Sequence, residues 1–481
     1  MPRRVRFIFL PALVAGLLLL VFTYVALAWT PLPVVNDPKV RMPGTQPGQL
    51  TDAIEPVARC GCHDKYNQAI EPSYNWQGSM MSQAARDFLF WSTMTVAGQD
   101  AIWAVGNPNA TDICLRCHSP KGWLEGRSDP TNGSALTGSD FEGVQCNFCH
   151  RLYDPYFETT YAGTREGNDW VGYWDEIGAT PSTAAAATYG VDKALTSTLK
   201  LFNNGSFFVG NVPFSPTYLE NGGGQYFVSP VDIRRASFAD ADPAHAFYYS
   251  RYHKSKYFCS TCHDVSNPVL ANLTADPAQP LPTEANSAYS YYHVERTFSE
   301  FMVSAYGQQG GTGGIGPFAS SVFTTSHPGN NIATCQDCHL RDVVGRAAQG
   351  GKAVIRPTGS TAHPKSGLPL HDMTGGNMWV SSILASTIAG SPNYDATNAA
   401  LLNGRALSLT LNLAAGGGFD AAALLSGVTR AQQMLQSAAA IQNITYTASS
   451  GQLSFRIQNQ TGHKLISGYP EGRRVFVNIK A

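Results

Sequence analysis

Cys114-Leu115-Arg116-Cys117-His118 sets the chemistry of this chain and the way in which it must fold. In the pattern Cys-x-x-Cys-His, two thiols are spaced to reach the two vinyl groups of one haem, and the adjacent imidazole binds its iron. Three further copies and one shortened copy use up every other cysteine: Cys146-Asn147-Phe148-Cys149-His150, Cys259-Ser260-Thr261-Cys262-His263, Cys335-Gln336-Asp337-Cys338-His339 and Cys60-Gly61-Cys62-His63. The sequence therefore predicts about five covalently bound haem c groups, with the motif histidines as proximal iron ligands.

Disulfides and structural zinc are the alternative uses of these cysteines. Neither explains why a histidine follows the second cysteine of every motif. The shortened motif departs from the pattern, because Cys60 and Cys62 stand one residue too close together. Either the peptide bends more tightly to attach haem through both thiols, or Cys62 alone attaches it, and in both cases His63 binds the iron.

The N-terminus predicts export. A basic start, Met1-Pro2-Arg3-Arg4, is followed by an apolar run from Phe7 to Trp29 that is close to the roughly 20 residues needed to span a bilayer. Residues 1–28 are therefore either a cleaved signal peptide or a retained membrane anchor, and residues 29–49 are a Pro-rich linker. We expect the remainder on the outer side of the cytoplasmic membrane, in the periplasm or at the outer cell surface.

The composition favours a loop-rich chain packed around cofactors. Lys and Arg total 33 against 34 Asp and Glu, so no basic excess points to nucleic acid. The 46 Gly and 29 Pro indicate much irregular polypeptide. We expect a mainly α and irregular multihaem cytochrome c fold over 50–405, a helical connector over 406–443 and a small β-rich segment over 444–481.

Hydrophobic periodicity predicts the regular elements. Residues 79–105 and 420–442 have the spacing of helices, and a shorter helical stretch covers 295–306. Alternating apolar residues at 453–457 and at 475–479 predict two half-buried strands. The second of these runs into Ala481, so we expect a C-terminal sheet, sandwich-like in type, that is incomplete.

The second axial ligand decides whether a haem iron carries electrons or binds a substrate. The histidines outside the motifs are His245, His253, His293, His327, His363, His371 and His463. They outnumber the predicted haems, so the chain can supply two histidines to every iron. Five of them are candidate distal ligands: His253, His293, His327, His371 and His463.

Several flanking segments resemble a known family. Trp76-Gln77-Gly78-Ser79-Met80-Met81, the motif at Cys114 through Trp123, and the stretches 459–464 and 469–474 are similar to exported multihaem cytochromes near the tetrahaem cytochrome c and hydroxylamine oxidoreductase superfamily. The resemblance covers the chain from about Gly48 and implies closely stacked haems. In that superfamily a Trp-x-x-Ser-x-His element supplies a distal histidine. Met81 stands at that position here, which implies His/Met ligation of one haem; alternatively, Met80 and Met81 pack in the core.

We therefore expect a c-type cytochrome that carries electrons through its haems in the cell envelope or extracellular space. Its partners would be a membrane quinol oxidoreductase, other cytochromes or an extracellular acceptor, and the chain would act as a homo-oligomer or as a subunit of a complex. The alternative is a haem enzyme that reduces or oxidises a small nitrogen compound, such as nitrite or hydroxylamine, at one five-coordinate iron.

Overall fold

The computed structural model describes residues 33–34, 37, 44–154, 183–198, 208–209, 212–213, 226–267, 292–359, 363–405, 413–465, 467–468 and 474–480. The predicted signal or anchor at 1–28 lies outside these residues, as does most of the linker at 29–49. Within the described part of the chain, no helix is both long enough and apolar enough to cross a membrane.

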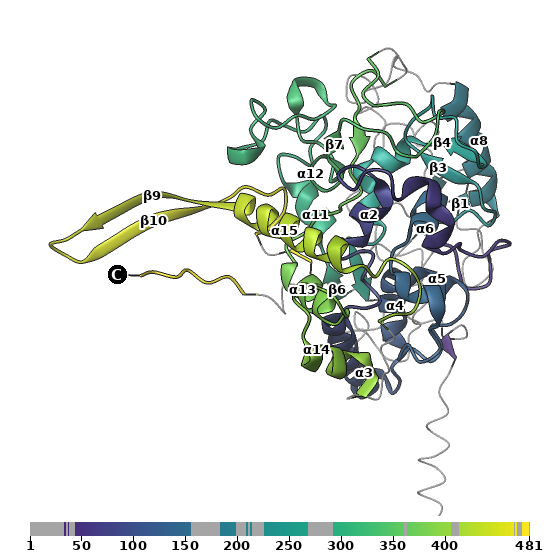
Figure 1. Cartoon of the computed structure of the whole chain (residues 1–481), viewed down its shortest axis with the longest axis horizontal. Helices are drawn as coiled ribbons and strands as arrows, with labels where there is room; N and C mark the ends of the chain where they lie inside the picture. Colours follow the sequence, from purple (N-terminus) through teal and green to yellow (C-terminus); the bar gives the residue numbers. More distant parts are fainter. Residues whose placement is uncertain are drawn as a thin grey trace, which may run out of the picture.

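The chain is mostly helical and irregular, with small two-stranded sheets (Figure 1). The α-helices are α2 (Pro72–Gln77), α3 (Phe88–Val105), α4 (Asp112–His118), α5 (Pro120–Leu124), α6 (Cys146–Arg151), α8 (Thr183–Ser197), α9 (Lys256–Ser260), α11 (Thr297–Val303), α12 (Gln336–His339), α13 (Met378–Ser386), α14 (Ala396–Ala400) and α15 (Ala421–Ala438). Short 3-10 helices include η2 (Val57–His63), η4 (Gly138–Glu142), η6 (Arg251–Lys254) and η10 (Pro328–Asn330). This confirms the predicted fold class at the level of secondary structure.

The sheets are short and mainly antiparallel. The pairs are β1 (Phe208–Val209) with β2 (Val212–Pro213), β3 (Arg234–Ala236) with β4 (Phe247–Tyr249), β5 (Val265–Asn267) with β6 (Tyr292–Glu295), β7 (Asp342–Val343) with β8 (Leu368–Pro369), and β9 (Ala439–Thr447) with β10 (Gln452–Asn459). Only β3 and β4 run parallel among these pairs.

Capping residues and a neighbouring strand set where the predicted helices begin. Asp87 accepts hydrogen bonds from the backbone N–H groups of Leu89 and Phe90 at 2.8 and 3.3 Å, so α3 begins at Phe88 and not at 79. Asp420 caps α15 through the N–H of Ala423 at 2.8 Å. The helix expected over 295–306 is reduced to α11, because the residues before Arg296 belong to β6.

The C-terminal sheet has one expected strand and one unexpected partner. The predicted strand at 453–457 lies in β10, but it pairs with β9, which occupies residues that were expected to end the preceding helix. Residues 475–479 are described as extended chain outside any strand, so the second predicted strand is wrong. Figure 1 shows the β9–β10 hairpin reaching away from the helical body at the end of α15.

One face of this hairpin is apolar. Leu453 lies opposite Tyr446, and Ile457 lies opposite Ile441, so these side chains share a face, with Phe455 between them along β10. The intervening residues, such as Ser454 and Arg456, take the other face. Most of the apolar side chains are exposed to solvent, so the hairpin has a face that the described chain does not cover.

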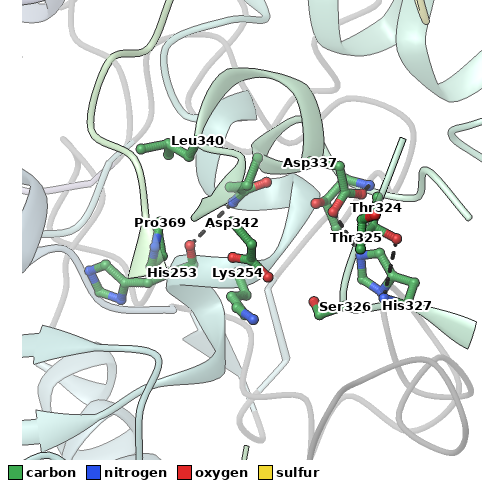
Figure 2. Close-up of a pocket in the computed structure, with 12 residues that line it drawn as sticks. His253, Lys254, Thr324, Thr325, Ser326, His327, Asp337, Leu340, Asp342 and Pro369 are labelled. Atoms are coloured by element: carbon green, nitrogen blue, oxygen red, sulfur yellow. Dashed lines mark hydrogen bonds and ion pairs between the residues drawn. The ribbon is translucent and has the colours of Figure 1, made fainter. Parts of the chain in front are cut away.

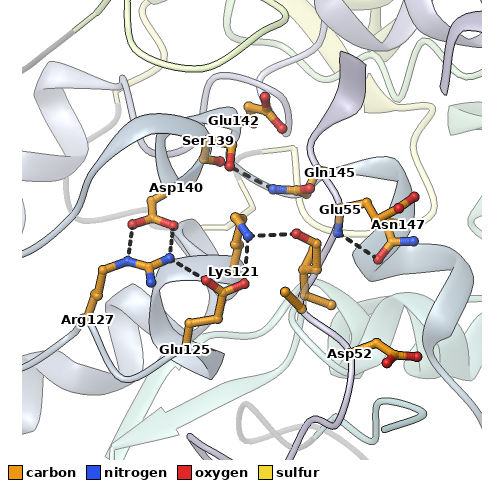
Figure 3. A network of polar contacts seen from close by, with 12 residues as sticks. Asp52, Glu55, Lys121, Glu125, Arg127, Ser139, Asp140, Glu142, Gln145 and Asn147 are labelled. Atoms are coloured by element: carbon orange, nitrogen blue, oxygen red, sulfur yellow. Dashed lines mark hydrogen bonds and ion pairs between the residues drawn. The ribbon is translucent and has the colours of Figure 1, made fainter. Parts of the chain in front are cut away.

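Buried polar side chains hold the irregular segments together. Lys121 donates to the carbonyl of Ile54 and to Glu125, both at 2.6 Å, and Arg127 pairs with Asp140 through two contacts of 2.6 and 2.5 Å (Figure 3). Charge-assisted bonds of this kind are stronger than bonds between neutral groups. They fix α5 and η4 beside the segment that leads to the first motif.

Arg86 joins two loops through hydrogen bonds of its buried side chain. Its buried guanidinium donates to the carbonyls of Leu413, Ala415 and Gly417 at 2.9, 2.7 and 2.8 Å. These bonds satisfy a stretch of loop backbone that forms no regular structure. Arg86 therefore fastens the loop before α15 to the loop before α3.

Replacing Arg86 by Met tests this role. The substitution keeps the apolar stem but leaves buried carbonyls without donors, so we expect the free energy of unfolding to fall by about 3 kcal/mol. Denaturant unfolding measures the change. Arg59→Met is the control, because 72% of the Arg59 side chain is exposed, and it should stay within about 0.5 kcal/mol of the parent. Equal stability of both variants would contradict the role of Arg86.

Candidate haem-binding sites

Every motif lies on a short helical turn that ends near its histidine. The motif at Cys114 is in α4, the motif at Cys146 is in α6, and the shortened motif ends η2. Cys335 immediately precedes α12, which ends at His339. At the remaining motif, Cys259 is in α9, and His263 lies in the turn that follows. A helical turn brings residues three apart to one side, so both thiols of a Cys-x-x-Cys pair face the same way.

Four motif histidines have their Nδ1 atoms against backbone carbonyls from distant segments. The contacts are His63 to Ala347 at 2.7 Å, His118 to Ala84 at 3.2 Å, His150 to Arg235 at 2.7 Å and His339 to Thr374 at 2.7 Å. A carbonyl oxygen only accepts, so each Nδ1 must carry the proton and donate. The lone pair is then on Nε2, which is the tautomer that a metal ligand requires.

Two of these histidines face a second imidazole. The ring centroids of His150 and His371 are 6.1 Å apart with planes 24° apart, and those of His339 and His463 are 6.4 Å and 15° apart. A metal about 2 Å from each of two facing ring nitrogens would place the centroids about 6 Å apart. The centroid separations of the two pairs match this spacing.

The partner histidines are also in the correct tautomer. His371 has Nδ1 at 2.8 Å from the carbonyl of Pro369, and His463 has Nδ1 at 2.9 Å from the carbonyl of Lys464. Within the described part of the chain, the Nε2 atoms of both pairs form no hydrogen bond. The structure brings together two of the predicted distal ligands with two of the predicted proximal ligands.

Burial keeps these imidazoles neutral. It lowers the pKa of His118, His150, His339 and His371 to about 4 in each case, although the backbone carbonyl contacts oppose the shift. At neutral pH each ring therefore has a free lone pair, as metal binding requires.

His253 and His327 are arranged differently. The ring of His253 lies 5.6 Å from that of His150, but its Nε2 is 3.1 Å from the carbonyl of Cys149. Nε2 of His327 is 3.1 Å from a carboxylate oxygen of Asp337, so this buried contact occupies that nitrogen of His327. Figure 2 shows the two imidazoles at opposite ends of one pocket. Iron ligation by either remains a prediction.

Iron ligation by His293 and Met81 also stays a prediction. His293 lies in β6 and not at the start of a helix, and its side chain lies outside the described part. Met81 belongs to the turn whose Ala84 carbonyl contacts Nδ1 of His118. That turn is therefore on the side of the ring away from Nε2. The neighbouring Met80 accepts a hydrogen bond from Ser381 at 3.2 Å and packs in the core, as the alternative interpretation expects.

Four of the motifs form one connected array. All ten cysteines are free thiols. Cys114, Cys149 and Cys262, from three different motifs, pack against the same hydrophobic core. Gln336 of a fourth motif donates to the carbonyls of His253 and Ser255, which precede the motif at Cys259, at 3.2 and 2.7 Å. The motif at Cys259 thus has neighbours on several sides.

Sequence reasoning missed the groups that orient the motif histidines. Ala84, Arg235, Ala347 and Thr374 act through backbone carbonyls, which any residue type would supply, so the sequence carries no signal for them. Glu295 was also missed: a carboxylate oxygen of its side chain lies 3.9 Å from Nδ1 of His263. Among the described residues, no group of three or more His, Cys, Asp and Glu is arranged to hold a metal ion, but a haem iron needs only two axial ligands.

Comparison of the chain with protein-family models, with curated proteins and with solved structures gives no match.

Asp112 provides a pH test of the packing around α4. It accepts hydrogen bonds from Trp123 at 2.8 Å and Ser128 at 2.7 Å, but burial outweighs them and raises the pKa of Asp112 to about 6. The unfolded pKa is about 3.9. The folded chain therefore holds this proton more tightly, so the stabilisation is complete below pH 3.9 and is lost as the pH rises through 6.

We expect the free energy of unfolding of the parent, relative to Asp112→Asn, to fall by roughly 2 kcal/mol between pH 4 and pH 7. Denaturant unfolding of both proteins at several pH values measures this difference. The comparison isolates Asp112, because all other titrating groups are common to both proteins. Parallel pH profiles would show that Asp112 ionises normally in the folded chain.

Proposed function

We propose that this chain is an exported electron carrier whose five cysteine motifs bind c-type haem. The observation that carries the proposal is the facing of His150 by His371 and of His339 by His463, at centroid distances of 6.1 and 6.4 Å. In each pair the Nδ1 atoms are occupied by backbone carbonyls. Both rings of each pair are thus in the tautomer that leaves Nε2 to bind a metal.

The motif residues would have two roles, attachment of the haem and ligation of its iron. The ten thiols would attach the porphyrins as thioethers, and the motif histidines would be proximal ligands. When bound, the haem irons supply reversible one-electron chemistry. His371 and His463 would hold two of them six-coordinate, which keeps substrates off the metal and favours electron transfer over catalysis.

The contacts between motifs support a relay more than a set of separate sites. Because cysteines of three motifs pack against the same core, and Gln336 of a fourth motif contacts the segment before Cys259, the attached groups would lie close to one another. We infer partners that are themselves electron carriers: a membrane quinol oxidoreductase, other cytochromes or an extracellular acceptor. We place the mature chain in the periplasm or at the outer cell surface, where thioether attachment takes place.

Covalent attachment is tested first. After expression with cytochrome c maturation and export, a reducing denaturing gel stained for peroxidase activity should show this chain, and its intact mass should include about five porphyrins. Replacing both Cys335 and Cys338 by Ser should remove one porphyrin, which serves as the matched control. A blank gel, or thiols that are released by reductant as disulfides are, would exclude the proposal.

The axial pairs are tested by His371→Ala and His463→Ala. Each change should leave one iron five-coordinate, so a high-spin signal and cyanide binding should appear in electron paramagnetic resonance and absorption spectra. His245→Asn is the control and should leave the spectra unchanged, because His245 is not a candidate ligand and its Nδ1 contacts the carbonyl of Ala246 at 3.1 Å. Unaltered spectra in both alanine variants would contradict the pairing. A high-spin iron already present in the parent would favour the nitrogen-compound enzyme.

A further inference from the structure

Glu295 distinguishes the motif at Cys259 from the others. The motif histidines His63, His118, His150 and His339 have Nδ1 against neutral backbone carbonyls. Among the described residues, His263 is the motif histidine whose Nδ1 faces a carboxylate, with Oε1 of Glu295 at 3.9 Å. The carboxylate of Glu295 therefore takes the position beside Nδ1 that a neutral backbone carbonyl takes in the other motifs.

The fold holds Glu295 in this place. It ends β6, opposite Val265 of β5, and Val265 follows His263 by two residues. Oε1 of Glu295 accepts hydrogen bonds from the backbone N–H of Thr297 at 3.0 Å and from the Thr297 hydroxyl. The backbone N–H of Phe298 donates to the carbonyl of His263 at 2.8 Å. Strand pairing and the start of α11 thus bring the carboxylate and the imidazole together.

The other carboxylate oxygen is unsatisfied. Oε2 of Glu295 is buried without a hydrogen-bond partner, in a side chain that is only 16% exposed. A buried acceptor without a donor is costly. The 3.9 Å separation is longer than a hydrogen bond, and a small rotation of either side chain would bring a carboxylate oxygen to Nδ1–H of His263. Oε2 of Glu295 is thus an acceptor without a donor, close to Nδ1–H of His263, which can donate.

A carboxylate beside Nδ1 of His263 would act on a bound metal through the imidazole. A carboxylate on Nδ1–H makes the opposite nitrogen a stronger electron donor to a metal. A stronger donor stabilises the oxidised iron and lowers its reduction potential.

We propose that Glu295 is a positioning residue for His263 and gives the haem attached at Cys259 and Cys262 a lower midpoint potential than it would otherwise have. The inference rests on the proposed function. Cys262 packs against the same core as Cys114 and Cys149 of two other motifs, so the lowered potential would stand at a junction of the array. Electrons would then occupy the haem at this junction less often than the haems next to it.

The test is a spectroscopic redox titration of the holoprotein with Glu295→Gln. The amide removes the charge but keeps the shape. We expect one midpoint potential to rise by about 59 mV, which is a tenfold change in a one-electron equilibrium constant, while the other midpoints stay in place. Glu295→Asp keeps the charge and should give a smaller shift of the same midpoint.

Glu125→Gln is the matched control, because it removes a half-buried carboxylate that pairs with Lys121 and Arg127 and touches no motif histidine. It should leave every midpoint unchanged. Identical titrations of the parent and Glu295→Gln, each with a full complement of porphyrin by mass, would overturn the inference and leave the proposed function intact. Loss of one porphyrin from both Glu295 variants would assign Glu295 to folding and also overturn it. Absence of porphyrin from the parent would refute the proposed function itself.

Discussion

The hydrogen bond from Nδ1 of a motif histidine to a remote carbonyl is the contact on which the arrangement of this chain depends. Each motif is local in sequence, but the carbonyls that orient its histidine are not: Arg235 serves His150, and Ala347 serves His63. These bonds position the rings and at the same time join distant segments. Ring orientation and tertiary structure therefore form together, and neither can be disturbed alone.

Arginine carries much of the remaining organisation. The largest fully buried side chains include five arginines: Arg86, Arg116, Arg151, Arg235 and Arg251. A guanidinium has five N–H donors in a fixed plane, so it can satisfy several loop carbonyls at once. Arg151, for example, donates to the carbonyls of Asp52, Ala53 and Ser229. In a chain with so little sheet and such short helices, these side chains replace the hydrogen-bond ladders of regular structure.

The sequence predicts the chemistry of this chain better than its geometry. Motif spacing identifies the cysteines and proximal histidines, and counting the remaining histidines gives a set of distal candidates that includes His371 and His463, which the fold brings to His150 and His339. Glu295 escapes such reasoning because only the pairing of β5 with β6 brings it to His263. The strand β9 was missed for a related reason. Residues 439–442 continue a helical pattern, so only tertiary context shows that they are extended.

The β9–β10 hairpin has a consequence for the C-terminal part of the chain. A two-stranded ribbon by itself is barely stable in water, because nothing compensates the ordering of its backbone. Both outer edges of this ribbon also present unpaired amide and carbonyl groups. Its backbone amides should therefore exchange with deuterated solvent much faster than those of α13 and α15. In concentrated solution the same edges favour association between molecules.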